Sequence, residues 1–176
     1  MNHQERQALK GFACKVRMGI VEAVYSAKSG HPGGSLSAAD MFAYLYNKEL
    51  RVDPENPRWE DRDRFVLSKG HAAPGLYSVL ANRGYFPVEE LETLRHIGSR
   101  LQGHPNMNDT PGIDMSTGSL GQGISAAVGM ALAAKHWGDG YRVYTLLGDG
   151  ECEEGRFHPS ASATPDGHHS RDSTAW

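Results

Sequence analysis

Apolar residues recur at about the period of an α-helix between residues 7 and 27, so the first predicted element is a long amphipathic helix. Its apolar positions are Leu9, Phe12, Ala13, Val16, Ile20, Val24 and Ala27. We expect Gly30 to act as its C-cap. A second helix is expected from residue 37 to about residue 50, because Ser37 and Asp40 have the spacing of a capping box before an apolar run.

Two short segments have the character of buried strands. Residues 65–68 form an apolar run, and residues 141–147 are rich in β-branched and aromatic side chains. Further helices are expected over residues 72–82, 88–96 and 119–137, with a loop over 98–116. Because helices and strands alternate, the predicted fold class is α/β, with a parallel sheet flanked by helices.

The character of the sequence changes after Gly155. Residues 156–176 contain no Leu, Ile, Val or Met and no periodic pattern. Such a segment cannot bury enough apolar surface to offset the entropy of ordering it. The expected organisation is therefore one domain over residues 1–155, within the ordinary size range, followed by an atypical, disordered tail over 156–176.

Charge and composition exclude some classes of partner. The chain has 18 Lys and Arg against 21 Asp and Glu, a formal net charge of -3, so it has no polycationic surface for nucleic acid. It has only two cysteines, which indicates a reducing, cytoplasmic setting rather than a disulfide-stapled secreted domain. No apolar run approaches the length of a membrane span, so we expect no membrane association and no processing of the chain.

Five glycine-containing segments lie at predicted element boundaries: 29–34, 68–72, 102–105, 118–123 and 148–150. Glycines let a ligand approach the backbone amides, and residues 118–123 open a helix whose dipole favours an anion such as phosphate. Close helix packing is the alternative use of these glycines. Asp149 follows a strand, where its carboxylate suits Mg²⁺ beside a phosphate; the alternatives are a simple turn or a helix N-cap.

Each of His31, His71 and His104 follows a glycine in a separate loop. This arrangement can bring several imidazoles to one polar cleft for hydrogen bonding and proton transfer. The alternatives are local bonds to backbone carbonyls, or zinc, although the short ligand spacing of zinc motifs is missing. The acidic residues after Asp149 are explained by the dipole of a following helix, and they disfavour Cys152 as a nucleophile.

The sequence resembles transketolases in five motifs that occur in the same order. They are S-G-H-P-G at 29–33, S-K-G-H at 68–71, G-H-P at 103–105, G-S-L-G-Q-G at 118–123, and G-D-G at 148–150 with Glu154 and Gly155. The resemblance covers about residues 5–155 and is to their N-terminal thiamine diphosphate-binding half, which occurs as a domain or as a separate subunit. It implies a Rossmann-like domain that binds thiamine diphosphate and Mg²⁺, for which Ca²⁺ or Mn²⁺ can substitute.

The resemblance also assigns roles to individual residues. Asp149 is implied as the metal ligand and Glu154 as a residue at the interface with the partner domain. The implied catalytic histidines are His31, His71 and His104. The implied cofactor contacts are His71, Gly118, Ser119, Leu120, Gly150 and Glu154.

The implied reaction is reversible transfer of a two-carbon ketol unit from a ketose phosphate to an aldose phosphate, a step of carbohydrate metabolism such as the pentose phosphate pathway, in which the cofactor acts as electron sink. The implied partners are sugar phosphates and a C-terminal transketolase subunit, or a homo-oligomer. That partner domain supplies the pyrimidine-binding half and the glutamate that activates the cofactor.

One departure from the family pattern bears on activity. Transketolases carry an asparagine that completes the Mg²⁺ site about thirty residues after the aspartate, whereas the last asparagine here is Asn108. We therefore expect a C-terminally incomplete domain from a truncated or frameshifted reading, inactive by itself. The alternative is a non-catalytic remnant that binds no cofactor. A nucleotide-binding module is disfavoured because the G-x-G-x-x-G fingerprint after the first strand and its later acidic residue are missing.

Overall fold

The computed structural model describes residues 1–155 and 157, so the expected tail lies almost wholly outside the described residues. The helices are α1 (His3–Ala27), α2 (Pro32–Leu36), α3 (Ala39–Tyr44), α4 (Ala73–Asn82) and α5 (Gly123–Trp137), and the strands are β1 (Arg64–Leu67) and β2 (Val143–Leu146). A π-helical turn (Leu45–Glu49) continues α3, and 3₁₀ turns occupy Gly70–Ala72, Val88–Thr93 and Gly150–Glu153.

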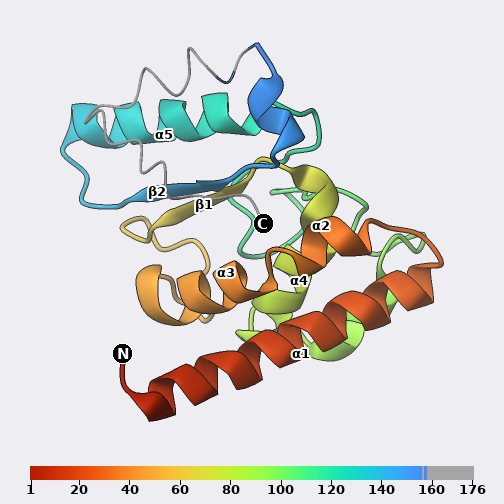
Figure 1. Ribbon diagram of the computed structural model, residues 1–176. Helices are drawn as coiled ribbons and strands as arrows, with labels where there is room; N and C mark the ends of the chain where they lie inside the picture. The colour runs from red at the N-terminus through yellow and green to blue at the C-terminus, as the bar shows by residue number, and fades with distance from the viewer. Residues whose placement is uncertain (156, 158–176) are drawn as a thin grey trace.

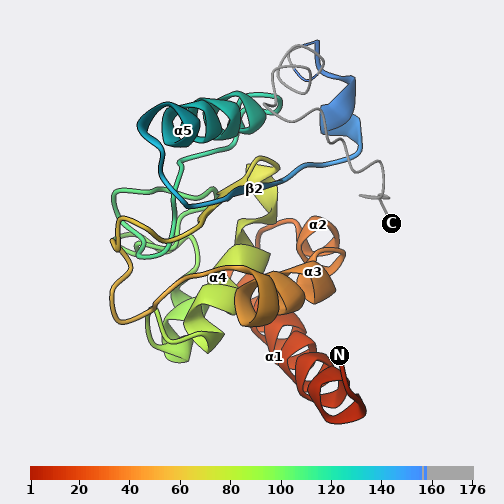
Figure 2. The same cartoon turned by 90° about the vertical axis from the view of Figure 1, so that its left-hand side faces the viewer.

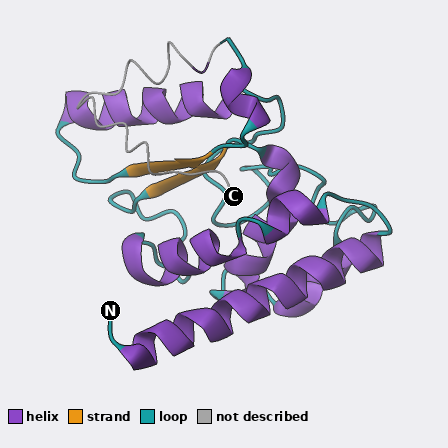
Figure 3. Cartoon of the chain, viewed as in Figure 1, coloured by secondary structure: helices purple, strands orange, loops and turns teal. Residues whose placement is uncertain are grey.

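The two strands form a parallel pair in which Arg64 lies opposite Val143 and Leu67 opposite Leu146. Helix α5 covers one face of this pair, and α3, α4 and α1 are stacked on the other side (Figures 1 and 2). The strands are thus the middle layer between helices, as Figure 3 shows by colour. The predicted α/β class with a parallel sheet flanked by helices is confirmed.

The core is centred on α4, which is buried along almost its whole length. The apolar stripe of α1, including Val16 and Ile20, packs against it. The two helices approach so closely at Gly19 that a Cβ there would lie 2.4 Å from the Ser78 hydroxyl oxygen. That hydroxyl donates to the Val16 carbonyl over 2.8 Å. Helix α4, which leads away from one of the glycine segments, is therefore firmly anchored.

The start and the C-cap of α1 differ from the sequence prediction. The helix begins four residues earlier, at His3, because Asn2 and Glu5 form a reciprocal capping box. Its last residue is Ala27, as expected, but its C-cap is Lys28, which takes the left-handed conformation (φ 51°), so the prediction of Gly30 as C-cap was wrong.

The expected helix from residue 37 to 50 is also wrong in detail. It is divided between α3 and the π-helical turn, and α2 ends at Leu36, before the expected helix begins. The Ser37 hydroxyl does not cap a helix; it donates to the carbonyl of Gly34. The expected helix over 88–96 is a 3₁₀ turn that ends at Thr93. Helix α5 begins at Gly123 rather than 119, because Gly121 has a positive φ of 77°. Among the described helices, none is both long enough and apolar enough to span a membrane.

Candidate functional site

The glycine-containing segments gather at the carboxyl ends of the two strands. Ser68 and Lys69 follow β1, and both donate their backbone amides to the carbonyl of Leu146 at the end of β2. The turn at Gly148–Gly150 follows the same end of β2. This edge is where ligands bind in open parallel α/β sheets.

A cleft of about 730 Å³ opens at this edge; we call it the sheet-end cleft. Its walls come from four of the five glycine segments. It is lined by Gly33, Gly34, Ser37, Asp40, Met41, Lys69, His71, Leu120, Leu147, Gly148, Asp149, Gly150 and Glu151. The volume is in the range of small-molecule and cofactor sites.

The glycines of these segments have two different uses. A Cβ at Gly70 would lie 2.8 Å from the backbone nitrogen of Gly118, and one at Gly123 would lie 2.5 Å from the Ser68 hydroxyl oxygen. These two positions therefore serve close packing of one loop on another. At Gly33 and Gly150, by contrast, a Cβ would meet nothing within 4 Å. The backbone at those two positions is open to a ligand in the cleft.

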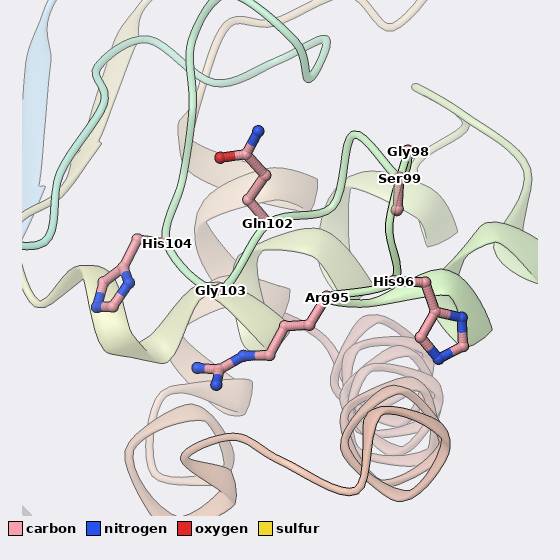
Figure 4. Close-up of a pocket in the computed structure, with 7 residues that line it drawn as sticks. All are labelled: Arg95, His96, Gly98, Ser99, Gln102, Gly103 and His104. Atoms are coloured by element: carbon pink, nitrogen blue, oxygen red, sulfur yellow. The ribbon is translucent and has the colours of Figure 1, made fainter.

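The three sequence-predicted histidines converge, but His71 lines the sheet-end cleft, His104 lines a second hollow, and His31 lies beside His71. The His31 and His71 rings lie edge to face with centroids 5.4 Å apart. His104 packs against Gly118, where a Cβ would lie 3.0 Å from its Cδ2. Its ring borders a second, shallower hollow of about 450 Å³ beside Arg95 (Figure 4). The Arg95 side chain extends to the His104 side of this hollow and donates to the Ser29 hydroxyl over 2.7 Å.

Burial and neighbouring positive charge both act on the histidines. Burial, followed by the charges of His31, Lys69 and His104, lowers the pKa of His71 below its ordinary value. Burial, then Arg95 and His31, lowers the pKa of His104. Both rings are therefore held neutral near pH 7, and a neutral imidazole can donate one hydrogen bond and accept another.

Asp149 lies exposed at the mouth of the sheet-end cleft. It precedes the 3₁₀ turn Gly150–Glu153, yet its side chain makes no capping hydrogen bond, so the N-cap alternative finds no support. Lys69 lines the same cleft and is almost buried; burial lowers the pKa of its ammonium group, while Asp149 and Glu151 act in the opposite direction. Over residues 1–155 and 157, no group of three or more His, Cys, Asp or Glu side chains could hold a metal, so zinc finds no support either.

The structure reveals one residue whose role the sequence interpretation missed. Glu151, explained above by the helix dipole, is buried with 2% exposure. Its Oε1 accepts from the Ser68 hydroxyl (2.6 Å) and the Gly121 amide (2.9 Å), and its Oε2 accepts from the Gly148 amide (3.0 Å). The carboxylate thus joins three glycine segments. Its position directly after G-D-G was the only signal in the sequence, and an exposed first-turn acid has the same signal.

Cys152 and Glu154 lie in and just after the same 3₁₀ turn as Glu151. Burial, and then the charges of Glu151 and Asp149, raise the pKa of Cys152, whose thiol donates to the Gly148 carbonyl. This agrees with the expectation that Cys152 is no nucleophile. Glu154 is exposed, and its Cβ lies 3.0 Å from where a Cβ at Gly121 would stand. It therefore borders the loop 118–123 from the outside.

A comparison with known families decides the lineage. The family described as "Transketolase, thiamine diphosphate binding domain" matches residues 9–168. The chain belongs to the transketolase family. The match extends thirteen residues beyond the boundary at 155 that composition suggested.

Transketolase relatives of two architectures resemble the chain. It is 50% identical over 146 residues to the 6-deoxy-6-sulfo-D-fructose transketolase subunit of Clostridium sp. (strain MSTE9), covering 83% of this chain and 53% of that protein. It is 48% identical over 155 residues to the transketolase of Homo sapiens, covering 88% of this chain and 25% of that protein. The chain thus spans about half the length of the Clostridium relative and a quarter of the human transketolase.

A solved structure of a Campylobacter jejuni transketolase superposes with a TM-score of 0.84 at 38% identity, covering 92% of this chain and 26% of that one. Transketolase from Leishmania mexicana gives the same TM-score at 36% identity, covering 88% of this chain and 25% of that one. The arrangement of helices around the strand pair is therefore that of a transketolase domain.

Proposed function

We propose that this chain is the diphosphate-binding part of a transketolase that transfers a two-carbon ketol unit between sugar phosphates. The observation that carries the proposal is the sheet-end cleft, where Lys69, Asp149 and the open backbone at Gly150 border one space. A cation, a carboxylate and an unobstructed glycine backbone are together the groups that a metal-bound diphosphate requires. The cleft volume of about 730 Å³ is ample for such a cofactor.

Different residues of the cleft would bind the metal, the diphosphate and the rest of the cofactor. Asp149 would hold the metal, with the diphosphate oxygens as further ligands, and Lys69 would neutralise the diphosphate charge. Gly150 would pass close to the phosphates, and Gly118, Ser119 and Leu120 would border the rest of the cofactor. When bound, the cofactor supplies the electron sink for cleaving and forming a carbon–carbon bond. That Ca²⁺ or Mn²⁺ can replace Mg²⁺ stays a prediction.

The histidines would serve the sugar and the diphosphate. His31 and His71, with ring centroids 5.4 Å apart, form one polar pair at the edge of the cleft. His104 lies against Gly118 on the other side of the loop 118–123. Imidazoles at these positions can hydrogen-bond sugar hydroxyls and move a proton to or from them. We assign His31, His71 and His104 to this role.

A second chain is part of the proposal. Two similar proteins are named as subunits of transketolases, the one from Clostridium and one of an apulose-4-phosphate transketolase from Phocaeicola vulgatus. We propose that a pyrimidine-binding subunit, or a second copy within a homo-oligomer, covers the sheet-end cleft beside Glu154. Sugar phosphates are the proposed substrates. Cys14 and Cys152 are free thiols, which is consistent with a reducing compartment, and the cytoplasmic location stays a prediction.

Ligand-dependent thermal unfolding tests the proposed function. A ligand at 100 times its Kd stabilises the folded state by about 2.7 kcal/mol, which raises Tm by about 5–10 °C in a chain of this size. We expect thiamine diphosphate with Mg²⁺ to produce this shift, and thiamine with Mg²⁺ to produce none because it lacks the diphosphate. ADP with Mg²⁺ controls for general diphosphate binding. Equal shifts with all three compounds, or none with any, would support the alternative of a remnant without a cofactor site.

A further inference from the structure

Two buried carboxylates stand at opposite ends of the strand pair. Asp63 lies just before β1, with 1% exposure, and accepts from the backbone amides of Arg51 (2.9 Å) and Arg142 (2.8 Å). Glu151 lies at the other end, beyond β2, and accepts from Ser68, Gly121 and Gly148. Each carboxylate therefore joins the chain around β1 to the chain around β2, one at each end of the strand pair.

The two carboxylates differ in how their charge is compensated. The guanidinium of Arg51 also donates to Asp63 over 3.2 Å, so that carboxylate has a cationic partner. Within residues 1–155 and 157, the hydrogen bonds to Glu151 come from a hydroxyl and two backbone amides, and the ammonium group of Lys69 acts on it through charge alone. Burying a carboxylate on neutral donors is costly unless every lone-pair direction is well used. Such a group specifies geometry more than it adds stability.

The bonds of Glu151 also decide which amides remain for a ligand. The loop 118–123 was expected to offer its amides to a phosphate, yet the Gly121 amide already points at the Glu151 carboxylate. The Gly148 amide is engaged by the same group. A resident anion thus occupies these two donors. The open backbone at Gly150 and the ammonium group of Lys69 are left to face the cleft.

We propose that Glu151 is a positioning residue that sets the spacing between the loop 118–123 and the turn 148–150. By occupying the amides of Gly121 and Gly148, it directs the cofactor diphosphate to Gly150 and Lys69. This inference rests on the proposed function. It concerns how this chain builds its cofactor site: Glu151 borders the sheet-end cleft, but its three hydrogen bonds run to protein groups and not into the cleft.

Amide hydrogen exchange, followed by NMR in the cofactor-free chain, tests the positioning directly. Glu151→Gln keeps the size of the side chain but turns one acceptor into a donor, so at least one of the Gly121 and Gly148 amides loses its partner. We expect exchange at that amide to accelerate at least tenfold, with the Arg51 and Arg142 amides unchanged. The matched control Asp63→Asn should accelerate exchange at Arg51 or Arg142 and spare both glycines. Unchanged protection of both glycines in Glu151→Gln overturns the proposal.

Cofactor titration of the same two variants separates positioning from general stability. At a temperature where both variants stay folded, Glu151→Gln should raise the Kd for thiamine diphosphate with Mg²⁺ at least tenfold. Asp63→Asn should leave that Kd within about threefold even where it lowers Tm. Equal weakening by both variants reduces Glu151 to a structural role and overturns the proposal. If the unaltered chain binds no cofactor, the proposed function fails, and the exchange data alone decide whether Glu151 holds the two loops.

Discussion

At the scale of single residues, glycine substitutions in α5 distinguish packing glycines from permissive ones. A Cβ at Gly123 would lie 2.7 Å from the Ser68 Cα, which is backbone and cannot rotate away. We expect Gly123→Ala to lower the free energy of unfolding by about 1–3 kcal/mol, the usual cost of overpacking. Gly129, in the same helix, has nothing within 4 Å. Gly129→Ala should raise stability by about 0.5–1 kcal/mol through helix propensity. Urea denaturation measures both, and equal changes would contradict the close contact at Gly123.

The two histidines with lowered pKa values give stability a pH dependence. A histidine whose pKa is lower in the folded state binds fewer protons there than in the unfolded state, so stability rises with pH up to the unfolded value near 6.5. This contribution is lost as pH falls below about 6.5. We expect ring-proton NMR titrations of His71 and His104 to have midpoints below 6.5, and His71→Gln to flatten the dependence of Tm on pH just below 6.5. A midpoint at or above 6.5 for His71 would contradict its burial beside positive charge.

The sequence predicted the positions of some residues of the candidate site but not of others. The position of Asp149 at the cleft could be predicted, because G-D-G follows a strand and the carboxyl ends of parallel strands border the ligand edge; its role as a metal ligand stays a prediction. Glu151 could not, because a buried acceptor and an exposed first-turn acid look the same in sequence. The bonds that distinguish them come from Ser68 and Gly121, which are 83 and 30 residues away along the chain.

At the scale of elements, one hydroxyl connects α4 to the loop that carries His104. The Tyr77 hydroxyl lies 2.9 Å from the carbonyl oxygen of Gln102 and 3.1 Å from that of His104. Tyr77→Phe would leave those carbonyls without this donor, so we expect a loss of about 1–2 kcal/mol in the free energy of unfolding. It should also broaden or shift the NMR signals of the His104 backbone. Tyr25→Phe, at an exposed position on α1, is the matched control and should change neither. A Tyr77→Phe variant as stable as the unaltered chain would rule out this anchor.

Element positions followed from the sequence wherever burial alone decides them. The strands and α4 lie within two residues of the predicted bounds, because a continuous or periodic apolar run directly reflects packing on the core. The bounds of the elements from α2 to the π-helical turn could not be predicted from the sequence. There, a Cβ at Gly75 of α4 would lie only 2.7 Å from the Phe42 ring. The path of this segment is therefore set by its fit against α4, a tertiary contact that local propensity does not contain.

At the scale of the whole molecule, the strand pair is unequally covered. The β1 side chains from Phe65 to Leu67 are buried, whereas all four residues of β2 are only half-buried. Strands of parallel sheets are normally buried on both faces, so we expect further protein to pack against β2. The alternation of helix and strand predicted the α/β class, and the order of the motifs indicated the family. The two separate hollows beside His71 and His104 had no sequence signal, since they depend on how the loops pack together.

The central claim is that the sheet-end cleft binds thiamine diphosphate through a metal held by Asp149. Calorimetric titration of the purified chain with thiamine diphosphate, with and without Mg²⁺, tests it most directly. The matched control for Asp149→Ala is Asp40→Ala, because Asp40 lines the same cleft but pairs with Arg17. We predict saturable binding that requires Mg²⁺, is lost in Asp149→Ala and persists in Asp40→Ala. A folded chain that shows no binding, or binding unaffected by Asp149→Ala, would contradict the claim.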